Sequence, residues 1–541
     1  MKNIVKVKNN VLAGICSLVL VVGVSLALIP MSWSLTSANA AGAPSCKVYD
    51  NYIKYNTKTI AGTSTKGKYK GKGLVQITIK KGSKTLGTGK TNANGKGTFK
   101  VALKSKIKKG SKFTITCKNL QTKKTKTLTY QTAKTHSASL AKVAVSKTLG
   151  KLPVAYGDYP FKFVSNKKPT LNPIKTKPTY TQSSEIGKSK VPTTKNVMTT
   201  KKYSTSKAKF TFKSKFFLPL DWTIRDSAFS NAQSAQIVNV KGHQYLYEVV
   251  SSVSQNKLTS NNATNESAKG RIIRYDYDKL LKLKADSTNW TALRHASAKV
   301  ADHEFVTPTE QKVLDCVLVG PEFAIGHGQG LAYNYKTGSL WMMYANKIAN
   351  KSGAYKGQYK NTLYQIDLKK LSPVKQLNFY MTKSIRNSSA TGSSITGSNN
   401  LAFDEAGNFY LNVTQKTPGT GNYATPAYAE RIYTGVLNEA TNQVTGMKVL
   451  RQHMKYSPGY NDQNLNYNPK NNRLYVVSDF AMYSIPVSKL RSGTVKSSDV
   501  RLSEFTTHRE TESITWDKSG HPLILKVRGP ELMYSSTKDT K

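Results

Sequence analysis

The C-terminal part of the chain repeats one pattern of hydrophobic and polar positions. An alternating apolar stretch leads into a short polar turn, and a second apolar stretch follows at once. Each clear copy has an Asn or Asp in the turn, a side chain that stabilises a reversing backbone. Because alternation with a period of two marks a half-buried strand, each copy predicts a β-hairpin. The copies are GLAYNYKTGSLWMM (330–343), NLAFDEAGNFYLNV (400–413), NLNYNPKNNRLYVV (464–477), SITWDKSGHPLILK (513–526) and the more divergent QIVNVKGHQYLYEV (236–249).

A second repeated segment follows several of the hairpins. It is an outer strand with a Lys-Leu ending, as in IRYDYDKL (273–280), YQIDLKKL (364–371) and YSIPVSKL (483–490). A hairpin and an outer strand that recur along the chain are typical of the four-stranded blades of a β-propeller. We therefore predict a propeller of about five to seven blades over residues 207–541. Residues 281–325 leave room for a further blade, and strand 209–218 could close the ring with the last one. A β-sandwich is the alternative fold.

Residues 41–135 alternate as well, but here lysine occupies the outward positions. The segments LVQITI (74–79), GTFKVAL (97–103) and KFTITCK (112–118) are separated by turn sequences such as KKGS and NANGKG, which predicts a small antiparallel sandwich. The stretch VQITIKKGSKTLGTGKTNANGKGTFKVALKSKIKKGSKFTITCKN resembles the bacterial immunoglobulin-like domains of surface proteins. The resemblance implies a spacer or a ligand-binding module that brings no catalytic residues. The expected fold class is thus all-β throughout.

Two segments lack this periodicity. Residues 136–206 scatter prolines through a background of Lys, Thr and Ser, so we expect an extended basic linker. Residues 1–40 begin with lysines, continue with an apolar run from Val11 to about Pro30 and end in Ala38-Asn39-Ala40. This order is typical of a cleaved secretory signal, after which no transmembrane segment is expected. A membrane anchor is the alternative, since the apolar run is nearly long enough to span a bilayer.

Charge is concentrated near the N-terminus. The whole chain has 82 Lys and Arg against 29 Asp and Glu. Residues 41–135 hold 23 lysines and a single acid, Asp50, and no arginine occurs before Arg225. Lysine is a mobile, hydrated point charge, whereas arginine supplies the planar fork used in bidentate recognition. A surface of lysines therefore indicates diffuse attraction to a polyanion.

For an exported protein, the expected partners of these lysines are anionic envelope polymers such as teichoic acids or acidic polysaccharide. Nucleic acid is not expected, because the chain has no recognisable module for it. The alternative is that the charge only keeps the protein soluble. The expected polyanion-binding residues are Lys66, Lys68, Lys70, Lys72, Lys104, Lys106, Lys108, Lys109, Lys123, Lys124 and Lys126.

Two cysteines bracket the predicted sandwich. Cys46 and Cys117 could close a loop of about 72 residues, which the chain-entropy treatment values at roughly 4 kcal/mol. Export permits such a bond, but the sequence does not establish it.

The candidate ligand site lies where the loops before the inner strands of a propeller converge on its axis. The residues at these positions are His327, Gln329, Asn399, Gln463, Glu510 and Glu512. Most are amides, and acids occur in one blade only, so the set is too poor in carboxylate and histidine for a metal. We expect no catalytic residue, metal or cofactor here. Amides suit a hydroxyl-rich ligand, although they could also satisfy one another in the channel.

The order of several segments resembles the helveticin J-like proteins, secreted proteins of lactic acid bacteria known as large bacteriocins. The matching positions are Gly326, His327 and Gln329; Gly407, Asn408, Tyr410, Gln415, Lys416 and Pro418; and Glu512, Ser513 and Ile514. The resemblance covers about residues 215–535 and implies a propeller with antibacterial activity. This chain departs from the pattern by its secretory signal, its immunoglobulin-like domain and its basic linker, and these additions favour a protein held at an envelope surface.

The leading expectation is therefore a secreted, non-enzymatic binding protein or adhesin at the bacterial cell surface. Its lysine-rich region would hold it on anionic wall polymers and present the propeller to a glycan or a host surface. One alternative is a helveticin-like bacteriocin that acts on related bacteria. Another is a glycan-active enzyme that works at the propeller axis.

Overall fold

The computed structural model of the chain describes residues 42–48, 57–108, 111–132, 146–156, 161–171, 174–175, 179–180, 194–201, 209–219, 231–251, 269–301, 305–345, 349–384, 391–395, 397–415, 418, 427–527 and 529–539. The chain divides into two compact units. Unit 1 comprises residues 1–133 and 303–308, and unit 2 comprises the remainder. The predicted secretory signal, residues 1–40, lies outside the described residues.

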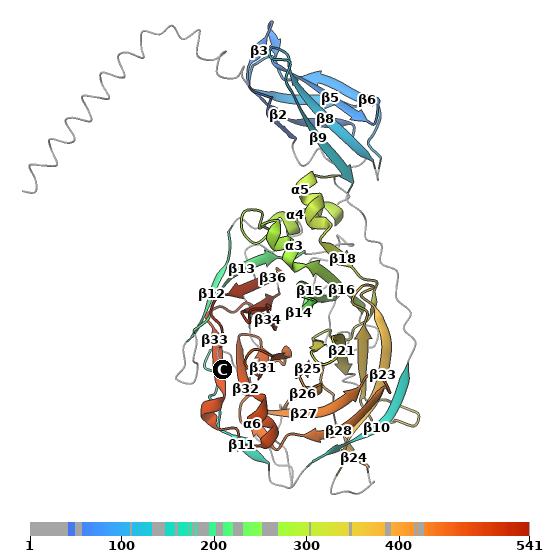
Figure 1. Cartoon of the computed structure of the whole chain (residues 1–541), viewed down its shortest axis with the longest axis vertical. Coiled ribbons are helices and arrows are strands. Elements are labelled where there is room, and N and C mark those ends of the chain that lie inside the picture. Colours follow the sequence, from blue (N-terminus) through green and yellow to red (C-terminus); the bar gives the residue numbers. More distant parts are fainter. Residues whose placement is uncertain are drawn as a thin grey trace, which may run out of the picture. The chain divides into compact units, whose positions relative to one another are not determined.

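Unit 1 is an antiparallel β-sandwich (Figure 1). Its first sheet has the order β1-β2-β7 and its second the order β17-β9-β8-β5-β6. The alternation of the sequence sets the layers, because Val75, Ile77 and Ile79 of β5 are buried while Gln76 and Thr78 between them are not. The strands are β1 (Cys46–Val48), β2 (Thr59–Ser64), β5 (Val75–Lys81), β6 (Lys84–Lys90), β7 (Thr98–Ala102), β8 (Lys112–Asn119), β9 (Thr125–Thr132) and β17 (Phe305–Val306), with a separate hairpin β3 (Lys68–Tyr69) and β4 (Lys72–Gly73).

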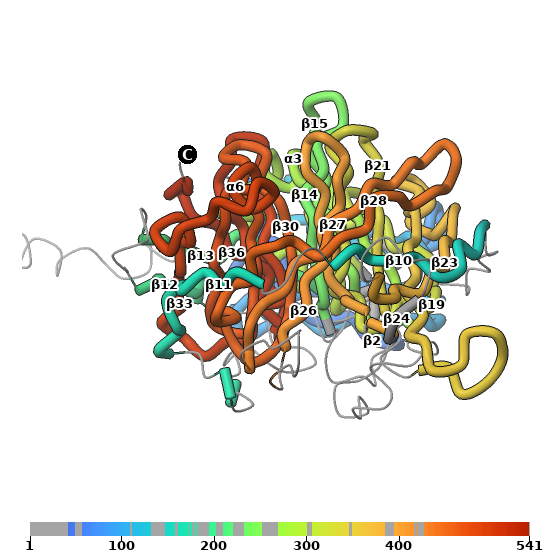
Figure 2. The backbone as a smooth tube through the Cα atoms, turned by 90° about the horizontal axis from the view of Figure 1, so that it is seen from below, coloured from blue at the N-terminus to red at the C-terminus, as the bar shows by residue number. Residues whose placement is uncertain are grey.

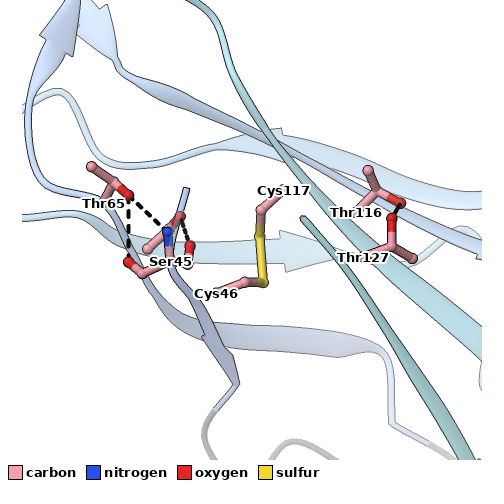
Figure 3. The surroundings of a disulfide bond; sticks show 7 residues. Ser45, Cys46, Thr65, Thr116, Cys117 and Thr127 are labelled. Carbon is pink, nitrogen blue, oxygen red and sulfur yellow. Dashed lines mark hydrogen bonds between the residues drawn. A yellow bond between two sulfur atoms is a disulfide. The ribbon is translucent and has the colours of Figure 1, made fainter. Parts of the chain in front are cut away.

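A disulfide joins the two sheets of the sandwich. Cys46 of β1 is bonded to Cys117 of β8, with 71 residues of sequence separation (Figure 3). The Cys117 side chain is fully buried in the core between the sheets. The bond therefore ties the short first strand to the centre of the larger sheet.

Unit 2 is a five-bladed β-propeller, which confirms the predicted fold class (Figure 1). The inner strands are β14 (Asn231–Val240), β20 (Gly330–Asn334), β25 (Ala402–Phe403), β30 (Asn464–Asn468) and β34 (Thr511–Trp516). Each of them contacts the next, and β34 contacts β14, so the five form a ring. All five overlap the predicted hairpins, although β14 and β34 begin before the predicted bounds of 236 and 513.

Each blade continues outward from its inner strand by antiparallel pairing. The first blade adds β15 (His243–Ser251), β16 (Lys269–Asp276), β18 (Val317–Val319) and β19 (Phe323–Ala324). The second adds β21 (Ser339–Ala345), β22 (Lys360–Ile366), β23 (Pro373–Ser384) and β24 (Thr391–Ser394). The third adds β26 (Asn408–Gln415), β27 (Ala429–Asn438), β28 (Gln443–Val449) and β29 (Gln452–Met454). The fourth adds β31 (Arg473–Ser478), β32 (Ala481–Pro486) and β33 (Arg501–Phe505), and the fifth adds β35 (Pro522–Lys526) and β36 (Glu531–Ser535).

The fifth blade takes its outer strand from far upstream in the sequence. Strand β13 (Thr211–Phe217) pairs antiparallel with β36, as Phe212 lies opposite Ser535 and Phe217 opposite Glu531. The predicted strand 209–218 therefore closes the ring. The fifth blade thus combines a strand that precedes the first blade in the sequence with strands from the end of the chain. Their backbone pairing holds the ring closed without a covalent bond.

Two details of the repeat differ from the prediction. The Lys-Leu octets form the third strand of a blade and not its outermost one, and a one-turn helix follows in two of them, α3 (Tyr277–Lys282) and α6 (Val487–Ser492). Asp276 ends β16 and caps α3 by accepting a hydrogen bond from the Lys279 backbone N–H at 3.0 Å. Residues 281–325 form no extra blade in their described part, which contains the helices α4 (Ala292–Ala301) and α5 (Pro308–Leu314).

The predicted linker, residues 136–206, differs most from expectation. Its described part contributes three strands that run along the outside of the propeller (Figure 2). Strand β10 (Lys147–Ala155) pairs in parallel with β23, β11 (Lys162–Val164) in parallel with β29, and β12 (Val197–Lys201) with both β33 and β13. Since the outer edge of a blade exposes unpaired backbone groups, these strands cover edges that would otherwise be open. We call the described residues of 146–201 the belt.

The belt is anchored by buried side chains. Phe161 packs against His453 in a tilted arrangement with ring centroids 4.0 Å apart, and Phe163 meets the same ring edge-on at 5.8 Å. Burial, with a further contribution from Arg431, lowers the pKa of His453 to about 3. Farther along, the Thr170 hydroxyl and the Leu171 N–H donate to the carboxylate of Glu504 at 2.9 and 3.1 Å. The belt is therefore an integral part of the propeller.

None of the helices in the described part of the chain is long and apolar enough to cross a membrane.

Candidate functional site

Three of the predicted axis residues meet in one hydrogen-bonded chain. Gln329, Gln463 and Glu510 each directly precede an inner strand, β20, β30 and β34 respectively. The Gln329 side-chain amide donates to Gln463 Oε1, and Gln463 Nε2 donates to Glu510 Oε1 at 3.2 Å. All three side chains are buried. Because the loops before the inner strands converge on the axis, residues from the second, fourth and fifth blades come into direct contact.

Two further residues complete this network. Asp479 lies in the turn between β31 and β32, and it accepts a hydrogen bond from Gln463 Nε2 at 3.2 Å. Asn461, two residues before Gln463, donates to Asp479 through its side chain at 3.1 Å and through its backbone N–H at 3.2 Å. Asp479 is fully buried. We call Gln329, Asn461, Gln463, Asp479 and Glu510 the axial cluster.

A tyrosine from the belt completes the axial cluster from outside the blades. The Tyr180 hydroxyl donates to Asp479 Oδ1 at 2.6 Å and accepts from Asn461 Nδ2 at 3.0 Å. Its ring packs edge-on against Phe480 with centroids 5.6 Å apart. Phe480 in turn stacks on His508 at 4.9 Å with nearly parallel planes. Tyr180 belongs to no strand of the propeller, yet its hydroxyl forms hydrogen bonds with two members of the cluster.

The electrostatics of the axial cluster are dominated by carboxylates. Burial raises the pKa of Tyr180 far above its usual value, and the charges of Asp479, Glu510 and Glu512 add to this effect. Burial lowers the pKa of Lys526 well below its usual value, and Arg509 lowers it further, while Glu531, Glu510 and Glu512 oppose the shift. Glu512, the second residue of β34, is buried close enough to affect both groups. The arrangement favours neutral hydroxyl or amide groups over anions as ligands.

The remaining predicted axis residues have other surroundings. Asn399 is buried and accepts a hydrogen bond from the Ala345 backbone N–H at 2.9 Å, so it fastens the loop before β25 to the second blade. A Cβ at position 330 would collide with the Asn399 carbonyl oxygen, which explains the glycine that begins β20. His327 is half-buried in the loop before the same strand.

Sequence reasoning missed Asp479 and Tyr180 as members of the site. Asn461 occupies the same position before its inner strand as His327, so the repeat places it at the axis as well. Asp479 lies between two apolar strands in the sequence VVSDFAMY, where an acid is unusual. That contrast was the available signal. The sequence gives no such signal for Tyr180, because the composition of the belt does not show which of its residues contact the propeller.

Metal ligation was not expected. In the residues that the structure describes, no group of three His, Cys, Asp or Glu side chains is arranged to hold a metal ion.

The predicted polyanion-binding lysines fall into two groups at opposite ends of β5 and β8. One group surrounds the hairpin β3-β4, where the ammonium groups of Lys70 and Lys123 each lie 5.7 Å from the centre of the Tyr69 ring. The other group, Lys104, Lys106 and Lys108, lies in the loop after β7. Lys109 is outside the described residues. Every lysine that the structure describes between residues 42 and 132 is exposed.

Comparisons with known proteins identify no relative of this chain. No family model matches the chain, and no curated protein matches it. Among solved structures, a glucose dehydrogenase is similar over 67% of this chain and 100% of its own, at 10% identity and a TM-score of 0.26. A GH43_1 enzyme from Xanthomonas citri complexed with xylotriose is similar over 56% of this chain and 87% of its own, at 8% identity and a TM-score of 0.30. A mannose phosphorylase from Leishmania mexicana covers 60% and 89%, at 8% identity and a TM-score of 0.23.

These comparisons contradict the expectation of a non-enzymatic protein, because all three similar structures are enzymes. The identities of 8 to 10% and the low TM-scores carry none of those activities over to this chain.

Proposed function

We propose that this chain is a secreted protein of the bacterial cell surface, which unit 1 retains on anionic wall polymers while the propeller binds a glycan at its axis. The observation that carries the first half is the surface of unit 1. All its described lysines are exposed, and no Asp or Glu occurs among its described residues. A polyphosphate or polyuronate chain would thus meet positive charge at both ends of the sandwich. The amides and carboxylates of the axial cluster support the second half.

Retention by lysine should respond to salt. The Debye length falls from about 8 Å at physiological ionic strength to about 3 Å at 1 M, so molar salt should release the protein from purified Gram-positive cell walls. The measurement is co-sedimentation with walls over a series of NaCl concentrations. Protein that stays fully bound in 1 M NaCl would rule out a purely electrostatic attachment.

The lysines around the hairpin β3-β4 allow a more specific test by mutation than a change of salt. In the quadruple variant Lys68→Gln, Lys70→Gln, Lys72→Gln and Lys123→Gln, we expect weaker wall binding and a smaller salt dependence. By analogy with flexible single-stranded nucleic acids, the log–log slope against salt should drop by up to about 0.7 for each lysine that contacts a phosphate. The matched control replaces four exposed lysines of the propeller, Lys284, Lys356, Lys370 and Lys489, with Gln. Equal losses in both variants would mean that net charge alone matters and that unit 1 has no special role.

A second candidate function, cleavage of a glycan at the axis, is favoured by one observation. Gln463 Nε2 bonds both Asp479 and Glu510 at 3.2 Å, so these carboxylates lie no more than twice that distance apart. Carboxyl pairs at such separations are the acid and base groups of glycoside hydrolysis.

The assay for this second candidate function is release of reducing ends from cell-wall polysaccharide. If the wild type turns over, Asp479→Asn and Glu510→Gln should each lower the rate by about 100-fold or more, whereas Asp499→Asn in the fourth blade should not. Full activity in both axis variants would exclude this candidate.

A further inference from the structure

The occupant of the axial cluster in this structure is part of the chain itself. Tyr180 comes from the belt, not from any blade. Its hydroxyl bridges two members of the cluster, donating to the Asp479 carboxylate at 2.6 Å and accepting from the Asn461 amide at 3.0 Å. Asp479, Gln463 and Phe480 are buried, whereas Tyr180 and its partner Asn461 are half-buried. The tyrosine therefore lies at the boundary between the cluster and the outside.

The hydrogen bonds of Tyr180 define what this position accepts. A group that donates to a carboxylate and accepts from an amide with one oxygen is a hydroxyl. A carboxylate could not donate to Asp479 and would be repelled by it and by Glu510. An ammonium could donate, but it has no lone pair to accept from Asn461. The arrangement therefore selects an uncharged hydroxyl, the group that surrounds the rim of a sugar and the chain of a polyol.

The neighbourhood of this hydroxyl matches the same class of ligand. Phe480 is fully buried. Its ring stacks on His508 and packs edge-on against the Tyr180 ring, with centroids 5.6 Å apart. The Gln463 amide lies one hydrogen bond further in and continues the network to Glu510 and Gln329. A small polyhydroxylated molecule in place of the Tyr180 side chain would find an aromatic wall and a chain of polar groups that reaches into three blades.

We propose that Tyr180 is an internal cap, which occupies the hydroxyl subsite of a carbohydrate-binding site at the propeller axis and must leave before a sugar or polyol can bind. Asp479 and Asn461 are the residues that recognise the hydroxyl. This inference deepens the glycan-binding half of the proposed function and rests on it. It does not depend on the retention of unit 1 by anionic polymers.

A cap of this kind lowers the apparent affinity of its own site. Only the fraction of molecules in which Tyr180 has left is able to bind, so the apparent dissociation constant is the intrinsic one divided by that fraction. Removing the side chain should therefore strengthen binding without changing the contacts of the ligand. A tyrosine that merely fastens the belt would give the opposite result, a less stable protein with no gain in binding.

The test uses the full mature chain and three probes: glycerol, ribitol and N-acetylglucosamine. Binding is measured by titration calorimetry and by saturation-transfer NMR. In Tyr180→Ala, we expect at least one probe to bind about tenfold or more tightly than in the wild type. Tyr180→Phe keeps the ring but removes the hydroxyl, so it should give a smaller gain in the same direction. Thr179→Ala, an exposed neighbour in the belt, is the matched control and should behave like the wild type.

Additional variants separate the cap from the site. Adding Asp479→Asn to Tyr180→Ala should abolish the gained binding, because the hydroxyl loses its charged acceptor. Thermal unfolding of each variant checks that the propeller remains folded. If the wild type and Tyr180→Ala bind a probe with the same affinity, the cap is wrong but glycan binding stands. If no probe binds to either protein, both the cap and the glycan-binding half of the proposed function are wrong.

Discussion

In the variant Glu531→Gln, we expect the free energy of unfolding of the propeller to fall by roughly 3–5 kcal/mol. Glu531 lies on β36 and is fully buried. It forms an ion pair with Arg509, accepts from the Ser214 hydroxyl of the closing strand β13, and accepts from Asn196 Nδ2 at 2.8 Å. The substitution leaves Arg509 buried without its counter-charge and loosens the strand that closes the ring. Breaking a buried pair from one side is costly for this reason.

Urea unfolding followed by tryptophan fluorescence measures this loss. The matched control is Lys489→Gln, which removes an ion pair to Asp499 of 2.6 Å whose lysine is 46% exposed. Exposed pairs contribute about 1 kcal/mol or less, so the control should remain close to the wild type. If Glu531→Gln is as stable as the control, Glu531 does not hold the ring closed.

In the variant Glu248→Gln, we expect the stability of the protein to depend less on pH between about 4.5 and 8. Glu248 is fully buried on β15, and burial raises the pKa of its carboxyl to about 8 from 4.5, although the Tyr275 hydroxyl that donates to Oε2 at 2.6 Å opposes the shift. The folded protein thus keeps a proton that the unfolded chain releases above pH 4.5. Stability is fully present below that pH and is lost as the pH rises towards 8, by about 1.4 kcal/mol per pH unit.

Glutamine cannot ionise, so the difference in unfolding free energy between the variant and the wild type should grow in favour of the variant from pH 5 to pH 8. Urea titrations at four pH values give this difference directly, and the titration of other groups cancels. Asp315→Asn, at an exposed site after α5, is the control and should show no such trend. A constant difference across the range would mean that Glu248 is charged in the folded protein.

The blades were predictable because their inner hairpins repeat an apolar pattern and turn at an Asx residue, although the structure buries nearly every position of these strands and not one face alone. Asp404, for example, accepts from the Asn408 N–H at 2.9 Å, and Asn468 accepts from the Lys470 N–H at 2.9 Å, as the repeat requires. The belt was not predictable in the same way. Strand β10 pairs with β23, buries Val154 in the core and packs Leu149 and Leu152 beside it. Its sequence nevertheless contains Gly150 and Pro153, which are typical of a loop and hide the strand.

Part of the axial cluster could be predicted from the sequence, because the repeat marks the positions before the inner strands. Gln329, Gln463 and Glu510 directly precede inner strands, and the geometry of a propeller brings such positions together whatever their sequence separation. Asp479 reaches the axis from a turn between the second and third strands of its blade, which the repeat does not mark. Tyr180 depends on the path of the belt, which only tertiary structure determines. Asn399 shares the sequence position but forms a hydrogen bond with the neighbouring blade instead.

The claim that unit 1 binds anionic wall polymers is tested most directly on two preparations of the same cell walls, one intact and one stripped of teichoic acid by mild acid. The measured quantity is the dissociation constant of the protein for each preparation at 0.15 M salt. We predict strong binding to intact walls and a loss of at least about tenfold after stripping, with binding restored when purified teichoic acid is coupled back to the walls. Equal affinity for the intact and the stripped walls would contradict the account.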